Sequence, residues 1–259
     1  MNKVLICVTS CNRQPYTKQC LESLLNNTDE PFDLIIIDNG SAQPSLDLLK
    51  NFEGKVFKNG TTCDVVYNKT NRGVAPALNQ GLRKIKPNQH FMKLDNDMVI
   101  PDNHRTWLTE MIDILENNQE NIRIVALSPF VYERKDHFRR RNIILNNNHE
   151  YKIEDPTGSP VLGPGKLVHN EVIRAIGAYN ETFGKYGYED TDYALRALRM
   201  GFRNIYYSEC KAKHIDDEQL PESKDWRGFK DSQLRRSAQK VSAARIEYAH
   251  DRSKVRIPL

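Results

Sequence analysis

The stretch "HFMKLDNDMVIPD", residues 90–102, decides the fold. Its apolar residues predict a buried strand, yet Asp95 and Asp97 stand where that strand ends. In an extended chain, residues two apart point to the same face, so these two carboxylates aim together while Asn96 points away. We therefore expect the strand to present paired carboxylates at the edge of a hydrophobic core.

Short apolar runs alternate with helical patterns through the first half of the chain. Strands are predicted over residues 3–10, 32–40, 63–68, 90–97 and 122–130, and helices over residues 15–27, 45–52, 75–85 and 104–118. Strands separated by helices predict right-handed crossovers and a mainly parallel sheet flanked by helices, which is a Rossmann-like α/β fold.

Polar side chains stand at the predicted carboxyl ends of these strands. Asp38 and Asn39 follow the second strand, and Asp95 and Asp97 end the fourth. Ligands of such sheets bind in the crevice beyond the carboxyl ends of the strands. Two hard oxygen donors on one side suit Mg²⁺ or Mn²⁺, which takes its remaining ligands from phosphate and water.

The second half of the chain is less regular. Residues 131–160 are polar and predict an insertion or a loose hairpin, and residues 204–216 predict a strand. Glycines in "VLGPGKL" (161–167) fit either a plain turn or a close backbone approach to a ligand. A helical pattern follows at 232–249.

The charge of the chain is concentrated rather than large. The net charge is +4, and residues 218–259 hold the excess, with ten Lys/Arg against six Asp/Glu. A second basic cluster lies at 133–142. Both fit a solvated surface, an anionic acceptor or membrane headgroups.

Five cysteines, an odd number, form no CxxC pair, and no apolar run approaches the roughly 18 residues that span a bilayer. We expect reduced thiols, a cytoplasmic protein, and membrane contact that is at most peripheral.

Several motifs, taken in order, resemble those of a known family. They are "VTSCNR", "IIIDNGS", "NRGVAPALNQGLRKI", "KLDNDMVIP", "GAYNETFGKYGYEDTDYALRALRMGF" and "KAKHI". Their order and spacing are similar to those of the GT-A glycosyltransferases, in particular the inverting enzymes of family 2 that carry a D-x-D motif. The resemblance covers roughly residues 3–215. It implies a donor-binding half at 1–130, an acceptor-binding and catalytic half at 131–217, and a basic extension at 218–259.

The resemblance also implies roles for residues of the donor half. Thr9 and Asp38 would hold the base and ribose of a nucleotide, uridine being expected, and Arg72 would lie near it. Asn79 would brace the loop. Asp95 would face the ribose and the metal shell.

The metal ligands implied by the resemblance are Asp97, Asp95 and His214, around Mn²⁺ or Mg²⁺. The donor would be a nucleoside-diphosphate sugar, and the acceptor a carbohydrate or glycolipid.

Two acidic residues precede the helical pattern at 191–201. Glu189 and Asp190 have the placement of acidic residues that cap a helix N-terminus. The resemblance implies instead that one of them is the general base of an inverting hexosyltransferase, which removes the proton of the acceptor hydroxyl. We assign Asp190 as the base and Glu189 as an acceptor ligand, and the reverse assignment stays open.

The chain departs from the family pattern at several positions. Asn39 stands where an acid is common, and Pro76 and Leu78 occupy positions where small residues and Arg are frequent. The Q-x-x-R-W signature of processive synthases is absent, so one sugar per encounter is expected. A flexible loop at 225–230, with Trp226 over the sugar or packed structurally, is a further expectation.

Two other functions are considered. A sugar-nucleotide nucleotidyltransferase needs a Gly-rich basic loop after the first strand to hold triphosphate. Residues 9–17 contain no glycine, and Arg13 is their only basic residue. A non-catalytic nucleotide- or sugar-binding module is the second alternative. A nucleic-acid acceptor is the weaker alternative for the basic tail, because no aromatic residues alternate with its basic residues.

Overall fold

The computed structural model describes residues 3–128, 138–161, 163–215 and 223–259. Its strands are β1 (Val4–Ser10), β2 (Asp33–Asp38), β3 (Thr62–Tyr67), β4 (His90–Asp95), β5 (Met98–Val99), β6 (Ile122–Leu127), β7 (Arg139–Ile144), β8 (Glu150–Asp155), β9 (Gly165–Val168), β10 (Arg203–Tyr207) and β11 (Lys213–His214). Its helices are α1 (Gln14–Asn26), α2 (Gln43–Lys50), α3 (Val74–Leu82), α4 (Trp107–Asn117), α5 (Asn170–Ile176), α6 (Glu189–Arg199) and α7 (Ser223–His250), with short 3-10 helices η1 (Glu181–Phe183) and η2 (Arg252–Val255).

One large sheet organises the described residues. Its strand order is β3-β2-β1-β4-β9-β6-β10-β8-β7, and a separate small sheet pairs β11 with β5. The β1, β2, β3 and β4 pairings are parallel, as is β6 with β10, whereas β9 runs antiparallel to both β4 and β6. The predicted Rossmann-like α/β fold is confirmed.

The register of the parallel half places its strand ends together. Ser10 of β1 pairs with Asp38 of β2, and Thr9 pairs with Asp95 of β4. The chain runs outward from β1 to β3 and then returns to the other side of β1 as β4. This reversal of strand order is the point where such sheets bind ligands.

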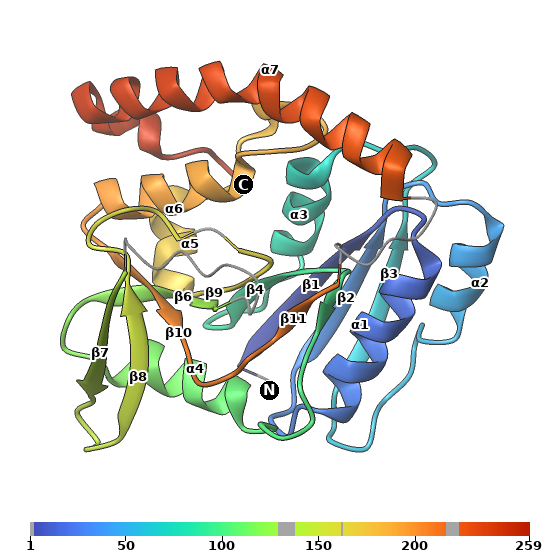
Figure 1. Ribbon diagram of the computed structural model, residues 1–259, viewed down its shortest axis with the longest axis horizontal. Coiled ribbons are helices and arrows are strands. Elements are labelled where there is room, and N and C mark those ends of the chain that lie inside the picture. Colours follow the sequence, from blue (N-terminus) through green and yellow to red (C-terminus); the bar gives the residue numbers. More distant parts are fainter. Residues whose placement is uncertain (1–2, 129–137, 162, 216–222) are drawn as a thin grey trace.

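Both faces of the sheet are covered by helices (Figure 1). Val4, Ile6 and Val8 belong to a core that includes residues of α1 and α4, whereas Leu5 and Cys7 belong to a core with residues of α3, α5 and α6. The alternation follows from the two-residue period of an extended chain. All five cysteines are free, in agreement with reduced thiols.

The structure corrects three expectations for the second half. Residues 165–168 form strand β9 and are not a turn. The segment 204–216 is not one strand, because it continues from β10 to β11 in a different sheet. Residues 225–230 lie in helix α7 and not in a loop, and the side chain of Trp226 is outside the described part.

The hairpin of β7 and β8 agrees with one of the two alternatives for residues 131–160. Residues 133–137 of the basic cluster lie outside the described part.

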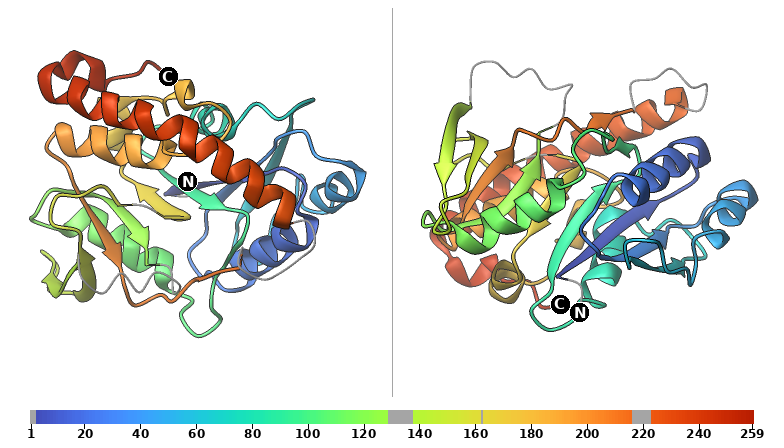
Figure 2. Two further views of the ribbon diagram at one scale, coloured as in Figure 1. Left: turned by 45° about the horizontal axis from the view of Figure 1, so that its top comes forward. Right: turned by 90° about the horizontal axis from the view of Figure 1, so that it is seen from below.

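The basic tail folds onto the rest of the protein. Helix α7 packs on α6, η1 and η2 (Figures 1 and 2). Within the described residues, no helix is both long and apolar enough to cross a membrane.

A buried ion pair fixes α6 to the chain around it. Arg196 is 0% exposed and donates to Asp192 at 2.8 Å and to the carbonyls of Ile176 and Ala178 at 2.9 and 2.8 Å. Tyr248 of α7 donates to the other oxygen of Asp192 at 2.7 Å. The pair therefore connects α6, α7 and the segment after α5.

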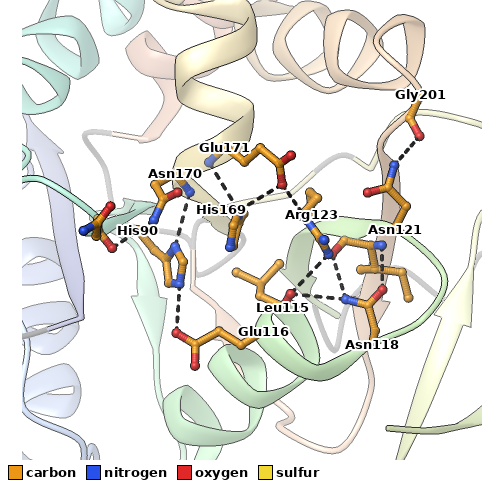
Figure 3. A network of polar contacts seen from close by, with 12 residues as sticks. His90, Leu115, Glu116, Asn118, Asn121, Arg123, His169, Asn170, Glu171 and Gly201 are labelled. Atoms are coloured by element: carbon orange, nitrogen blue, oxygen red, sulfur yellow. Dashed lines mark hydrogen bonds and ion pairs between the residues drawn. The ribbon is translucent and has the colours of Figure 1, made fainter. Parts of the chain in front are cut away.

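A second polar network lies at the amino edge of the sheet, away from the strand ends described above (Figure 3). The rings of His90 and His169 are 4.6 Å apart. Nδ1 of His90 accepts from the N–H of Asn170, and Nδ1 of His169 accepts from the N–H of Glu171, each at 3.2 Å. Both rings therefore satisfy the first N–H groups of α5 only while Nδ1 is unprotonated.

Burial keeps these two imidazoles neutral. Burial lowers the pKa of His90 in spite of its contact with Glu116. Burial, with the nearby His90 and Arg123 charges, lowers the pKa of His169 to about 4. The unfolded chain therefore binds more protons than the folded protein between about pH 4 and the ordinary histidine pKa of about 6.5.

We predict that Arg196→Ala lowers the free energy of unfolding by about 3–5 kcal/mol, because it leaves Asp192 charged and buried without its partner. The measurement is urea denaturation at neutral pH. Arg199→Ala, on the exposed side of the same helix, is the control and should cost less than about 0.5 kcal/mol. A loss below about 1 kcal/mol for Arg196→Ala would contradict the prediction.

We also predict that the contribution of His90 and His169 to the free energy of unfolding is at its full value above about pH 6.5 and falls as the pH drops toward about 4. His169→Asn should flatten this slope, because asparagine caps the helix without titrating. Denaturation series across this pH range check it, with the exposed His250→Asn as control. An unchanged slope in His169→Asn would contradict the assignment.

Candidate active site

A polar crevice opens at the carboxyl ends of β1 and β4. The ends of β1 and β4, the loops that follow β1, β2 and β4, the residues around the start of α3, the loop before α6, the first turn of α6 and strand β11 all contribute to its lining. The lining residues are Thr9, Ser10, Cys11, Arg13, Asn39, Asn71, Val74, Lys93, Asp95, Asn96, Asp97, Lys185, Tyr186, Glu189, Asp190 and His214. The two D-x-D carboxylates, the acidic pair at 189–190 and His214 thus share one crevice, as the resemblance implies.

Asp97 is held between Arg13 and His214. Its Oδ2 accepts from Arg13 at 2.9 Å, and its Oδ1 lies 3.3 Å from Nε2 of His214. Burial opposes the charge of Asp97, but the contact with His214 and the charges of His214 and Arg13 outweigh it and hold the pKa well below its usual range. Asp97 is therefore ionised at neutral pH.

Local backbone geometry brings the partners of Asp97 to it. Asn12 and Arg13 both have a φ of 55°, a left-handed conformation that residues other than glycine seldom adopt. The turn they make directs Arg13 back over the crevice at the start of α1. On the opposite side, pairing of His214 with Met98 between β11 and β5 places the imidazole next to Asp97.

Lys93 links the D-x-D motif to the acidic pair. Its Nζ lies 2.8 Å from Oδ1 of Asp95 and 2.5 Å from Oδ2 of Asp190. Burial opposes the charge of Lys93, but the carboxylates of Asp190 and Asp95 outweigh burial and raise its pKa well above the usual value.

Burial raises the pKa of Asp95, with further increases from Asp97 and Asp190 and a partial offset by Lys93.

The two acidic residues at the start of α6 are in different electrostatic states. Burial and the charge of Asp190 raise the pKa of Glu189 to about 7, and its Oε2 accepts from the N–H of Gly187 at 2.9 Å. Burial opposes ionisation of Asp190 as well, but Lys166 and Lys93 outweigh it and lower the pKa. Asp190 is therefore the carboxylate of the two that is ionised throughout the neutral range.

The residues expected at the nucleotide lie at different distances from the crevice. Thr9 lines it. Asp38 is fully buried behind it, where its Oδ2 accepts from the N–H groups of Gly40 and Ser41. Arg72 is exposed and is not among the lining residues, so the structure does not bring its side chain into the crevice.

Asn39, which stands in place of an acid, has a definite structural role. Its Nδ2 donates to Asn71 and to the carbonyl of Gly73, and its Oδ1 accepts from the N–H of Arg72. An aspartate lacks the two donors, so the amide is what shapes the loop before α3.

Asn79 braces a later segment, because it bonds both the carbonyl and the N–H of Tyr179.

Sequence reasoning missed Lys93, Lys166 and Arg13 as members of the site. Lys93 stands inside the apolar run of β4, and a lysine at that position is a signal, because a charge in a buried strand requires a partner. Lys166 lies in β9, which the glycine and proline pattern concealed. Arg13 was noted for its charge, but nothing in the sequence indicates its contact with Asp97.

The residues at the crevice fit a divalent cation in part. Asp97 Oδ1 is buried without a hydrogen bond among the described residues, and it faces His214. No group of three or more His, Cys, Asp or Glu side chains in the described ranges converges as a complete metal site. A cation held by Asp97 and His214 would take its other ligands from a bound diphosphate and water, as Mg²⁺ and Mn²⁺ commonly do.

The chain has the GT-A fold. Among solved structures it is similar to the mannosyltransferase PcManGT from Pyrobaculum calidifontis in complex with GDP-Man and Mn²⁺. The TM-score is 0.69 at 16% identity, over 96% of this chain and 64% of that one. It is also similar to Staphylococcus aureus TarS 1-349 in complex with UDP, with a TM-score of 0.59 at 17% identity, over 82% and 60% of the two chains.

The family follows from the sequence comparison. The model of glycosyl transferase family 2 matches residues 5–177, and the chain belongs to that family. An uncharacterized glycosyltransferase of Haemophilus influenzae is 24% identical over 177 residues, which are 68% of this chain and 48% of that protein. A teichoic acid poly(glycerol phosphate) polymerase of Staphylococcus epidermidis is 35% identical over 97 residues, 38% of this chain and 13% of that protein.

The chain thus spans about half the length of the first of these relatives and far less of the second.

We predict that Mn²⁺ together with UDP or GDP raises the melting temperature of the protein, and that Asp97→Asn abolishes the part of the rise that depends on Mn²⁺. The reason is that a neutral amide binds a hard cation far more weakly than a carboxylate. Thermal-shift titration measures the effect. The control is Asp64→Asn, which makes the same substitution at an exposed position of the edge strand β3. An equal rise in Asp97→Asn would place the cation elsewhere.

Proposed function

We propose that this glycosyltransferase transfers one sugar from a nucleoside-diphosphate sugar to an acceptor hydroxyl with inversion, and that it uses a divalent cation. The observation that carries the proposal is the position of Asp190. This ionised carboxylate lines the same crevice as Asp97 and His214 and is joined through Lys93 to Asp95. The residues proposed to bind the donor diphosphate and the residue proposed to deprotonate the acceptor therefore line the same crevice.

Asp190 is the proposed general base. Inversion requires a base that takes the hydroxyl proton as the acceptor oxygen attacks the anomeric carbon from the face opposite the leaving diphosphate. Asp190 lines the crevice and is ionised at neutral pH, which suits it to that role. Glu189 is more buried and is committed to the N–H of Gly187, which suits it to shaping the loop beside the acceptor.

The donor side carries the leaving group. Asp97 and His214 would hold the cation, which stabilises the negative charge that the diphosphate gains as the sugar leaves. Arg13 keeps Asp97 oriented and adds positive charge at the same end of the crevice. Thr9, Asp38 and Asn39 lie on the side of β1 and β2, where the nucleoside would bind.

The choice of nucleotide is narrowed by the solved relatives. One of them binds UDP and another binds GDP-Man, so uridine and guanosine donors are the two to test, uridine being our expectation. A carbohydrate or glycolipid is the acceptor class proposed.

Family membership favours this function over the nucleotidyltransferase and the non-catalytic module.

We predict that Asp190→Asn lowers the rate of sugar transfer by about 10²–10⁴-fold, because proton removal contributes a factor of that size. The assay uses UDP-N-acetylglucosamine or GDP-mannose as the donor in the presence of Mn²⁺ and measures the release of UDP or GDP. The acceptors are water and p-nitrophenyl glycosides. Thermal stabilisation by nucleotide and Mn²⁺ should persist in the variant, which separates loss of chemistry from loss of binding. Retained release in Asp190→Asn would sink the proposed role.

The pH dependence of kcat/KM distinguishes Asp190 from Glu189 as the general base. With Asp190 as the base, kcat/KM stays level through neutral pH, because the Asp190 pKa lies below its ordinary value. With Glu189 as the base, kcat/KM would fall below about pH 7. We expect the level profile in the wild type and in Glu189→Gln. A fall near pH 7 that disappears in Glu189→Gln would transfer the role to Glu189.

A further inference from the structure

Two lysines lie side by side in the interior of the sheet. Lys93 of β4 and Lys166 of β9 are direct cross-strand partners, and their side chains are 3% and 0% exposed. Residues that stand opposite each other in an antiparallel pair have their Cβ atoms about 5 Å apart, and like charges there are destabilising. The packing of the sheet gives no reason for this pair, because apolar side chains of the same length would fill the space at lower cost.

Both amines converge on Asp190. Nζ of Lys93 lies 2.5 Å from its Oδ2, and Nζ of Lys166 donates to its backbone carbonyl at 3.1 Å and lies 3.7 Å from its Oδ1. Oδ1 is a buried atom without a hydrogen bond among the described residues. Asp190 lines the crevice and its side chain is 16% exposed, so with Oδ1 buried we assign Oδ2, which contacts Lys93, to the acceptor side.

We propose that Lys93 and Lys166 are positioning residues that fix the carboxylate of Asp190 with Oδ2 toward the acceptor and compensate its charge. The proposal rests on the proposed function, in which Asp190 is the base. Lys93 orients Oδ2 and couples it to Asp95 on the donor side. Lys166 holds the first turn of α6 by donating to the backbone carbonyl of Asp190, and its Nζ lies 3.7 Å from Oδ1, the buried oxygen of that side chain.

The arrangement has a consequence for proton transfer. The charged and titratable groups around Asp190 are Lys93 and Asp95 from β4, Lys166 from β9, Glu189 from α6 and Tyr179 before η1. Replacing Lys166 by an uncharged residue leaves two carboxylates and Lys93 beside Asp190. Asp190 then holds its proton to a higher pH.

The test compares Lys166→Met with the wild type in the release assay, using UDP-N-acetylglucosamine and GDP-mannose with Mn²⁺ and water as the acceptor. We expect kcat to fall about 10–100-fold with the donor KM within twofold, and the acid limb of kcat/KM to move to higher pH. In an Asp190→Asn background, Lys166→Met should have no further effect, because Lys166 acts through that carboxylate.

Lys86→Met is the matched control. Lys86 contacts Asp33 at 2.6 Å near the amino end of β2, away from the crevice, and its loss should leave kcat and the pH profile unchanged. Lys166→Gln, which keeps an N–H donor without the charge, serves as a second variant if Lys166→Met does not fold, and it should show the same shift of the acid limb. Lys93→Met should lose more activity than Lys166→Met, because it also leaves Asp95 without its partner.

Three outcomes are distinguishable. Normal kcat and an unmoved acid limb in a folded Lys166 variant would overturn this inference while Asp190→Asn remains inactive. A donor KM that rises as much as kcat falls would also overturn it, because that pattern marks general damage to the site. Retained release in Asp190→Asn would instead remove the proposed function on which the inference rests.

Discussion

The pairing of β9 between β4 and β6 is the constraint on which the rest of the structure depends. This four-residue strand runs antiparallel to both neighbours and joins the parallel half of the sheet to the half that carries β6 and β10. A Cβ at Gly165, where β9 begins, would lie 2.8 Å from Cδ1 of the buried Leu127, so a larger residue there requires that side chain to move. Strand β9 is the backbone pairing that joins β4 to β6 within the large sheet.

The site is held together by alternating charges and not by apolar packing. Arg13 and His214 enclose Asp97, while Lys93 spans the gap between Asp95 and Asp190. Arg13, Lys93, Asp95, Asp97 and Asp190 each have an opposite charge within about 3 Å, which is the condition under which burial of ions is tolerated. Such a cluster contributes little to stability, so packing gives no reason for its presence at the crevice.

The sequence predicts the parallel half well because β1, β2 and β4 are nearly continuous apolar runs and their carboxylates fall at the strand ends. Motif order predicts Asp95, Asp97, Asp190 and His214 as site residues, and the structure brings these four side chains to one crevice. The sequence does not predict β9, in which a buried lysine interrupts a short strand flanked by glycine and proline. Burial of a lysine depends on its partners, and Asp190, one of the two carboxylates that contact Lys93, lies 97 positions away. Local pattern carries no information about a contact of that separation.

The position of the C-terminal tail also depends on contacts between residues far apart in the sequence, so local pattern does not predict it. Net charge alone suggests a surface that meets an anionic partner, but the inward face of α7 supports the loop beside the crevice. Ser237 donates to the carbonyl of Phe183 at 2.8 Å, and Leu234 lies so close to Gly187 that a Cβ there would be 2.8 Å from it. The next residues of that loop are Tyr188, with a φ of 67°, and the acidic pair. Helix α7 therefore supports the backbone segment that precedes α6, and at least one of its basic residues faces this segment, because Lys240 donates to the carbonyl of Thr182 at 2.6 Å.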